Sequence, residues 1–284
     1  MWWVGIYFGM VYLNFCGGGW WFGWVKIDGE CWSLRGVCEK CLKHVVKRLK
    51  NNRIGRVACC DFLLKNDGVV DFLRDYGIAV LNGVWLWRFL AFDVLRKISY
   101  VRSMDLSKLE VSILSNVFCD IVVENIKLIG KYCKVLNVVT DDLDKFSAVE
   151  RTFFDEYGVL INVSSNRAKS LMRSDVVLNF DFNLNYLKSC NIRNNCILVQ
   201  MNGERFVRRD GVTICSCKLN WPEKYGAFLE GHSAFSDLVL YESLAYSKIS
   251  FNGMRNVLKR DCIGIRYFVG NNGKIDFEEI RKKT

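Results

Sequence analysis

The sequence predicts an α/β fold built on a doubly wound, mostly parallel sheet. The first observation is that short apolar runs, such as "VSILS" and "KVLNVVT", alternate with segments of helical periodicity, such as "DIVVENIKLIGKYC". The second is that these runs are continuously apolar, which is typical of strands that helices bury on both faces. Because crossovers between parallel strands are right-handed, successive helices are expected to cover both faces of the sheet.

The N-terminal α/β part is expected to open with an aromatic β-hairpin. Residues 1–25 carry no charge and contain the triplet Gly17-Gly18-Gly19 between two aromatic runs. This pattern predicts strands over about residues 2–15 and 20–27 with a turn between them, and a third strand at "CWSL". A membrane anchor of the same length is the alternative, and its six glycines and single leucine argue against it.

Helices and strands then alternate as far as residue 105. The segment "VCEKCLKHVVKRLKNN" has Val37, Cys41, Val45 and Leu49 at helical spacing, with lysines on the opposite face. "IGRVACCDF" and "IAVL" are predicted strands. "DGVVDFLRDYG" is predicted as a short helix closed by Gly77, and "VWLWRFLAFDVLRKI" as a long apolar helix.

The pattern restarts after residue 105. "VSILS", "KVLNVVT", "VLINVSS", "DVVLNFDF" and "CILVQMNG" are predicted strands with helices between them. Beyond Gly203 we expect a hairpin at "RFVRRDGVTICSCKL", a helix at "SDLVLYESLAYSKI", and a terminal strand, turn and helix. This organisation predicts an N-terminal α/β domain over residues 1–105, a second domain over 106–203, and a C-terminal segment over 204–284 that packs on both.

The composition indicates a reducing compartment. Half of the 284 residues are apolar, which is enough for a large core and excludes global disorder. Several of the 13 cysteines lie in apolar strands such as "VACCDF", where a thiol acts as a small hydrophobic group. Because a chain of this size needs no disulfide scaffold and shows no basic secretory signal, we expect a cytoplasmic protein.

The net charge of +10 is spread along the chain. Basic residues occur in "KHVVKRLKNNRIGR", "RFVRRD" and "RKKT", without an arginine-rich run that alternates with aromatic residues. A solvated basic surface is therefore favoured over binding to nucleic acid or to a membrane. A small-molecule or nucleotide ligand, and assembly into a homo-oligomer, stay open.

Residues 108–203 resemble the Rossmann-type nucleotide-binding domains of the shikimate-dehydrogenase-like group. The resemblance rests on "VSILS" leading into a helix, on "VLNVVT" as second strand, and on "SDVVLNFDF", which is similar to the strand beside the nicotinamide cleft in that group. It covers about one third of the chain. It implies a Rossmann-like sheet, with NAD or NADP as the candidate cofactor in a cleft between two domains.

The loop from Ser115 to Asp120 departs from that group's pattern because it contains no glycine. Glycines let the backbone approach a pyrophosphate at a helix N-terminus. Here Val117 and Phe118 would crowd the phosphate, and Asp120 would repel it. Asp120 is better explained as the N-cap of the helix. After the second strand, Asp141 or Asp142 could hold a ribose hydroxyl, or could simply cap the next helix.

Polar side chains at the ends of the predicted strands are the candidate cofactor-binding residues. They are Ser115, Asn116, Thr140, Asp141, Ser164, Asn166 and Asn179. Since no convincing acid–base pair accompanies them, no catalytic residue is assigned. The sequence favours a non-catalytic protein that senses a ligand or binds a partner. The alternative is an NAD(P)-dependent oxidoreductase that acts on a small polar substrate in the inter-domain cleft.

Three further motifs have ordinary structural explanations. Cys31, Cys38, Cys41 and His44 have the identities of zinc ligands, but Cys41 belongs to an apolar helical stripe and no second Cys-x2-Cys exists, so packing is favoured. "FVGNNGKIDFEEI" imitates half of an EF-hand loop without its first carboxylates, so a tight turn before a helix is expected. His232 is either a solvated loop residue or a general acid or base.

Overall fold

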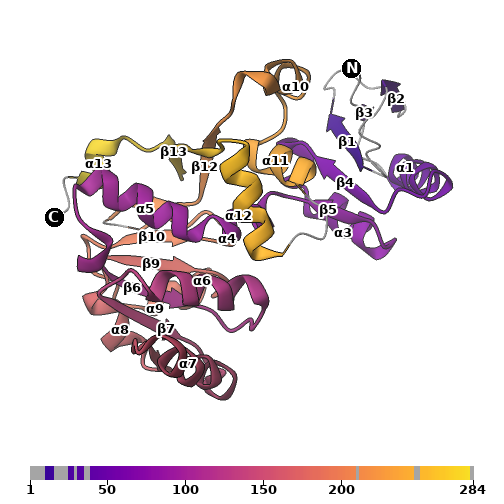
Figure 1. Cartoon of the computed structure of the whole chain (residues 1–284). Coiled ribbons are helices and arrows are strands. Elements are labelled where there is room, and N and C mark those ends of the chain that lie inside the picture. Colours follow the sequence, from indigo (N-terminus) through magenta and orange to yellow (C-terminus); the bar gives the residue numbers. More distant parts are fainter. Residues whose placement is uncertain are drawn as a thin grey trace. The chain divides into compact units, whose positions relative to one another are not determined.

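The computed structural model describes residues 10–15, 25–28, 31–34, 39–208, 211–245 and 250–281. The chain divides into two compact units, whose elements are labelled in Figure 1. The first unit comprises Met1–Gly83 and Glu223–Ser247, and the second comprises Val84–Pro222 and Lys248–Thr284. Because compact units are defined by contacts and not by independent folding, the predicted domain boundaries at residues 105 and 203 stay a prediction.

The first unit contains a five-stranded sheet in the order β2-β3-β1-β4-β5. β1 lies between β3 and β4 and is parallel to both, and β4 is parallel to β5. β2 runs antiparallel to β3. The strands are β1 (Met10–Phe15), β2 (Val25–Asp28), β3 (Cys31–Leu34), β4 (Arg56–Cys59) and β5 (Ala79–Leu81).

The antiparallel hairpin of this sheet is formed by β2 and β3, and not by β1 and β2 as the sequence predicted. The physical reason is that β3 and β4 occupy both edges of β1, which leaves β2 no edge of β1 to pair with. Asp28 pairs with Cys31, so two residues connect the strands, the length of a tight hairpin turn. The predicted third strand at "CWSL" is present as β3. Gly17-Gly18-Gly19 lies outside the described residues.

Helices complete the first unit. On α1 the predicted stripe of Cys41, Val45 and Leu49 is buried, so this face packs into the core. α11 is buried almost all round and contacts β4 and β5. The helices are α1 (Glu39–Asn51), α2 (Asp61–Leu64), α3 (Asp67–Asp75), the 3-10 turn η2 (Glu223–Tyr225), α10 (Gly226–Gly231) and α11 (Asp237–Ala245).

The second unit contains a six-stranded parallel sheet in the order β11-β10-β9-β6-β7-β8. Numbered along the chain within the sheet, this is the order 3-2-1-4-5-6 of doubly wound Rossmann folds. The predicted fold class is therefore confirmed. The strands are β6 (Glu110–Leu114), β7 (Val135–Val139), β8 (Asn162–Ser164), β9 (Val176–Asn179), β10 (Ile197–Gln200) and β11 (Thr213–Ile214).

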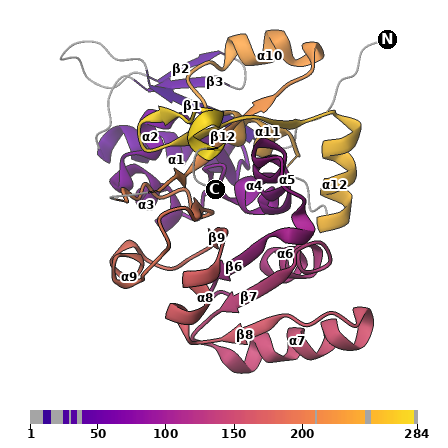
Figure 2. The ribbon, with the colours of Figure 1, turned by 90° about the vertical axis from the view of Figure 1, so that its left-hand side faces the viewer.

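Helices cover both faces of this sheet, as the continuously apolar strands required. Figure 2 shows α6 and α7 on one side of the strands, and α8 and α9 on the other. The helices of the second unit are α4 (Val84–Phe89), α5 (Ala91–Arg102), η1 (Leu106–Lys108), α6 (Asp120–Gly130), α7 (Leu143–Tyr157), α8 (Arg167–Arg173), α9 (Leu184–Ser189), α12 (Phe251–Arg260) and α13 (Phe277–Arg281).

A small antiparallel sheet of order β12-β13-β14 completes the second unit. Its strands are β12 (Ser216–Asn220), β13 (Gly264–Gly270) and β14 (Gly273–Lys274). Gly270 pairs with Gly273, so Asn271 and Asn272 form a tight turn before α13, as predicted for "FVGNNGKIDFEEI". No helix in the described ranges is both long enough and apolar enough to cross a membrane.

Candidate functional site at the switch point

The switch point of the doubly wound sheet lies between β6 and β9, the neighbouring strands from which the strand order runs in opposite directions. Ligands of such folds bind outside the carboxyl ends of the strands at this point. Here the position is taken by a side chain of the protein itself. Asp181, two residues after β9, directs its carboxylate at the β6–α6 loop.

The Asp181 carboxylate accepts hydrogen bonds from three groups of that loop. The Ser115 hydroxyl donates at 2.8 Å, the Asn116 backbone N–H at 2.9 Å and the Val117 backbone N–H at 2.8 Å. Successive backbone N–H groups of this kind are what a Rossmann loop offers to a phosphate. The loop therefore has an anion-binding geometry, and the bound anion is Asp181.

The turn that carries Asp181 is held by Asn179 at the end of β9. The Asn179 amide donates to the Phe182 carbonyl at 2.9 Å and to Gln200 Oε1 at 2.6 Å, and its oxygen accepts from the Phe182 N–H at 2.9 Å. Asn179 is fully buried. Arg88 on α4 donates to the Phe180 carbonyl at 2.8 Å. Asp181 is thus positioned by groups from three elements.

Asn116 links the ends of β6 and β7. Its amide donates to Asp141 Oδ2 at 2.9 Å, and its oxygen accepts from the Asp141 N–H at 2.7 Å and the Thr140 hydroxyl at 3.3 Å. The structure therefore brings four of the predicted site residues into one network: Ser115, Asn116, Thr140 and Asp141. The sequence analysis gave Asp141 as a candidate ligand of a ribose hydroxyl. Within this network its carboxylate accepts a hydrogen bond from Asn116.

The remaining predicted residues have local roles. Ser164 Oγ accepts from the Asn166 N–H at 2.9 Å, and Asn166 caps α8 by accepting from the Lys169 N–H at 3.3 Å. Asp142 pairs with Lys145, and the hydrogen bond from that ammonium group lowers the pKa of the Asp142 carboxyl. Cofactor binding by the predicted set stays a prediction.

The β6–α6 loop presents apolar side chains where a glycine-rich loop would present backbone. Val117 and Phe118 are exposed, and the Phe118 ring packs edge-on against Phe146 of α7 at 5.3 Å between centroids. The N-cap of α6 is Cys119, and not Asp120 as predicted. Asp120 is the first residue of the helix, where a carboxylate interacts favourably with the helix dipole.

The sequence analysis did not identify Asp181 or Arg88 as residues of the candidate site. The available signal was an acid in "LNFDF", immediately after the fourth strand of the sheet. In a doubly wound sheet that place adjoins the first strand's loop. Nothing in the local pattern around Arg88 pointed to the switch point, because only the packing of α4 brings it there.

A buried carboxyl lies in the first unit, on α11. Glu242 is 2% exposed, and Oε2 has no hydrogen-bond partner among the described residues. Burial raises the pKa of Glu242 to about 7, against the effect of a hydrogen bond from the Gly83 backbone. Such a pKa suits a general acid or base, although a side chain this buried offers no access to a substrate.

His232 belongs to an aromatic cluster of the first unit. Its Nδ1 lies 2.8 Å from the Phe228 carbonyl oxygen. The ring centroid lies 4.4 Å from that of Tyr12, 4.6 Å from that of Phe228 and 5.9 Å from that of Phe235. These contacts give the half-exposed imidazole a packing role in the turn after α10.

The candidate zinc residues do not converge where they are described. Cys41 is buried in the core, whereas His44 is exposed to solvent. Cys38 and the side chain of Cys31 lie outside the described part of the chain. Among the described residues, no group of His, Cys, Asp or Glu is arranged to hold a metal ion.

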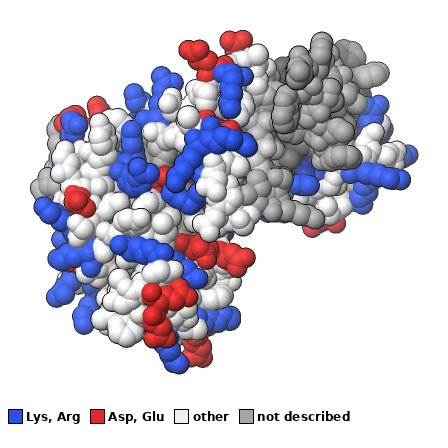
Figure 3. All heavy atoms as spheres, viewed as in Figure 1, with Lys and Arg blue, Asp and Glu red and all other residues white. Residues whose placement is uncertain are grey.

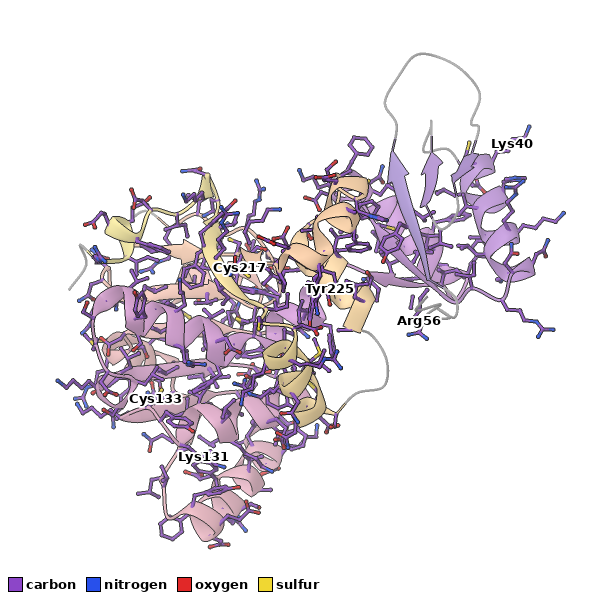
Figure 4. The ribbon with its side chains drawn as sticks, turned by 45° about the horizontal axis from the view of Figure 1, so that its top comes forward. Lys40, Arg56, Lys131, Cys133, Cys217 and Tyr225 are labelled. Carbon is purple, nitrogen blue, oxygen red and sulfur yellow. The ribbon has the colours of Figure 1, made fainter. Side chains whose placement is uncertain are left out.

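Three described thiols behave as hydrophobic groups. They are Cys59, Cys196 and Cys133, the last of which is labelled in Figure 4, and none of the three forms a disulfide. Burial raises the pKa of Cys59, Cys133 and Cys196 to about 12. These three thiols are therefore protonated at neutral pH and are poor nucleophiles.

Comparison with known proteins shows likeness in the fold alone. No protein-family model matches the chain, and no curated protein matches it in sequence. L-tryptophan dehydrogenase from Nostoc punctiforme is 10% identical with a TM-score of 0.33, over 82% of this chain and 62% of that one. A shikimate dehydrogenase in complex with NADP+ is 9% identical with a TM-score of 0.32, over 65% of this chain and 73% of that one. Aspartate transcarbamoylase from Trypanosoma cruzi in complex with phosphate is 11% identical with a TM-score of 0.33, over 83% and 81%.

Proposed function

We propose that this protein is a non-catalytic Rossmann-like protein that senses a ligand or binds a partner, and that it does not bind a dinucleotide at the switch point. The observation that carries the proposal is the set of hydrogen bonds from Ser115, Asn116 and Val117 to the Asp181 carboxylate. A cofactor phosphate would have to displace this carboxylate from the same donors. It would also meet the negative charge of the displaced group.

The loop sequence supports the same proposal. The backbone of a glycine-rich loop comes within hydrogen-bonding distance of a pyrophosphate because no side chains intervene. Here Val117 is 48% exposed and Phe118 is 42% exposed at that place. Both side chains would have to move before a pyrophosphate could reach the N-terminus of α6.

The test is a thermal melt of the full chain with and without NAD, NADH, NADP and NADPH. A ligand at about a hundredfold its Kd would stabilise the protein by about 2.7 kcal/mol. That corresponds to several degrees, at about 2–4 °C per kcal/mol for a chain of this size. We expect no shift with any of the four. A reproducible shift of several degrees with one of them would sink the proposal.

The Asp181→Ala variant tests whether the carboxylate holds the loop. Removing it leaves the Asn116 and Val117 backbone N–H groups without their acceptor, while the Ser115 hydroxyl keeps the Val117 carbonyl at 3.0 Å, so we expect the free energy of unfolding to fall by about 1–3 kcal/mol. Asp155→Ala, an exposed acid on α7, is the matched control and should change stability by less than about 0.5 kcal/mol. Equal stability of the two variants in urea titrations would contradict the assigned role of Asp181.

The alternative function is an NAD(P)-dependent oxidoreductase of a small polar substrate. One observation favours it: Ser115, Asn116 and Thr140 place polar groups at the carboxyl ends of β6 and β7, where ligands of doubly wound sheets bind. A selective shift with NAD(H) or NADP(H) in the melt described above would support this alternative and would justify a substrate search.

A further inference from the structure

A cavity of about 460 Å³ lies within the second unit, between α5, α12 and β13. Its size falls in the range of small-molecule sites. It shares no residue with the switch point, so it is a separate site.

The charge of the cavity is strongly positive. Arg96 and Lys97 come from α5, Arg255 and Lys259 come from α12, and Asp93 is the one carboxylate of the lining. Figure 3 shows Lys and Arg side chains gathered over this part of the second unit. One carboxylate cannot neutralise four cations, so the cavity attracts anions.

Two of the cations are held in place by neighbouring groups. Arg255 is 17% exposed; its Nη1 lies 3.4 Å from Asp93 Oδ2, and its guanidinium lies 5.4 Å from the centre of the Phe92 ring. The Lys97 ammonium group lies 5.2 Å from the Phe277 ring centre. Cations that are already ordered lose less conformational entropy when an anion binds.

The groups around Asp93 show that the positive charges converge. Burial raises the pKa of the Asp93 carboxyl, while the charges of Arg255, Arg96 and Lys259 act against that rise. Arg96 lies 3.7 Å from Asp93 Oδ1, on the side opposite the oxygen nearest to Arg255. Three cations from two helices thus act on one point of the cavity.

The floor of the cavity is apolar. Leu90 and Leu258 are buried, and Ile263 and Ile265 add two half-buried side chains at the start of β13. A ligand that fills this space must combine an anionic group with an apolar body. A free inorganic anion would leave the apolar floor in contact with water.

We propose that this cavity binds a small organic phosphate, a phosphate monoester with an apolar body, with the phosphate facing Arg96, Arg255 and Lys259. A phosphate suits the site better than a carboxylate because it carries close to two negative charges and three strong acceptor oxygens. Arginine binds phosphate through paired hydrogen bonds and lysine binds it as a point charge, and the cavity offers both.

The test uses 1-naphthyl phosphate as a fluorescent probe, titrated into the full chain at low and at high salt. We expect saturable binding at one site that weakens as salt screens the charges. Neutral 1-naphthol lacks the phosphate group, and inorganic phosphate lacks the apolar body. Each should therefore bind at least about tenfold more weakly than 1-naphthyl phosphate, a difference of about 1.4 kcal/mol. No saturable binding of 1-naphthyl phosphate, or equal affinity for all three compounds, would overturn the proposal.

A double variant locates the site. Arg96→Gln with Lys259→Gln removes two exposed cations of the cavity, of which Arg96 also pairs with Asp93, and keeps both Arg255 and Asp93; it should weaken binding at least about tenfold. The matched control, Lys169→Gln with Lys188→Gln, removes two exposed lysines of α8 and α9 and should bind as the unmodified chain does. Equal affinity of the two double variants would place the anion elsewhere and refute the site. The cavity shares no residue with the switch point, and the melts with NAD(H) and NADP(H) test the switch point alone, so failure here is separable from failure of the switch-point proposal.

Discussion

Two carboxylates of this protein lie in opposite surroundings. Asp181 is half-buried and accepts hydrogen bonds from two backbone N–H groups and a hydroxyl. Glu242 is 2% exposed, and one of its oxygens has no donor within the described part of the chain. Burial of a carboxyl group favours the neutral acid. The Asp181 carboxylate therefore holds the β6–α6 loop in place. Burial raises the pKa of Glu242 to about 7, so this group titrates near neutral pH.

The raised pKa of Glu242 predicts a pH-dependent stability. The ordinary value of 4.5 is raised to about 7 in the folded chain, so the neutral carboxyl is favoured in the folded state. The contribution of Glu242 to the free energy of unfolding is therefore complete below about pH 4.5, and it is lost as the pH rises through about 7. Glu242→Gln should therefore gain stability relative to the unmodified chain as the pH rises from 5 to 8, by up to about 3 kcal/mol.

Thermal melts of the two proteins at several pH values would measure this gain. Glu230→Gln is the control, since Glu230 is an exposed residue of α10 and its replacement should give a difference that does not vary with pH. A constant difference between Glu242→Gln and the unmodified chain across this pH range would refute the assigned titration.

At the scale of elements, α6 and α7 meet at a glycine. A Cβ atom added to Gly130, the last residue of α6, would lie 3.0 Å from Phe153 Cζ of α7 and 3.3 Å from Ile161 Cγ2. Phe153 is fully buried and has little room to yield. The helices pack this closely because Gly130 has no side chain.

Gly130→Val should therefore destabilise the chain by about 1–3 kcal/mol through overpacking. Gly68→Ala on α3 is the comparison, because its Cβ would meet only Asn66 Oδ1, at 3.4 Å. This helical substitution should be neutral, or should stabilise by up to about 1 kcal/mol. The midpoints of urea unfolding of both variants measure these changes in stability. An unchanged midpoint for Gly130→Val would mean that Phe153 can move aside.

Some strands could be predicted from the sequence, whereas the pairing of others could not. β6, β7, β9 and β10 were predictable because each is a continuous apolar run bounded by polar residues. The pairing of β1, β2 and β3 was not, because local pattern identifies strands but does not choose their neighbours. Within the candidate site, the polar strand ends were predictable from the fold rule for parallel sheets. The capping role of Cys119 was not, since its side chain makes no capping hydrogen bond.

At the scale of the whole molecule, the charge is positive but mixed. On the face shown in Figure 3, acidic groups lie among the basic ones. A net charge of +10 produces general attraction to polyanions, whereas DNA binding needs a continuous basic surface that neutralises several phosphates.

We therefore expect no saturable binding of a 20-base-pair duplex at about 150 mM salt with micromolar protein, measured by fluorescence anisotropy. The double variant Arg96→Gln with Lys259→Gln should behave in the same way. Tight binding that weakens steeply with salt, and that this variant abolishes, would show that the basic cavity region contacts nucleic acid.

The sequence by itself determined the class of fold and the place of the candidate site along the chain. Continuous apolar runs separated by amphipathic helices are compatible with few arrangements other than a doubly wound parallel sheet. The absence of glycine from Ser115 to Asp120 already set this loop apart from ordinary dinucleotide sites.

Only the tertiary structure decided what fills the site and where the charges gather. Asp181 meets the β6–α6 loop because β6 and β9 are neighbours in the sheet, although 65 residues separate Asp181 from Asn116. Arg96 and Arg255 converge on Asp93 because α5 and α12 pack together, although 162 residues separate Asp93 from Arg255. Hydrogen bonds and ion pairs depend on distances in space, and a local sequence pattern contains no information about distances between segments so far apart.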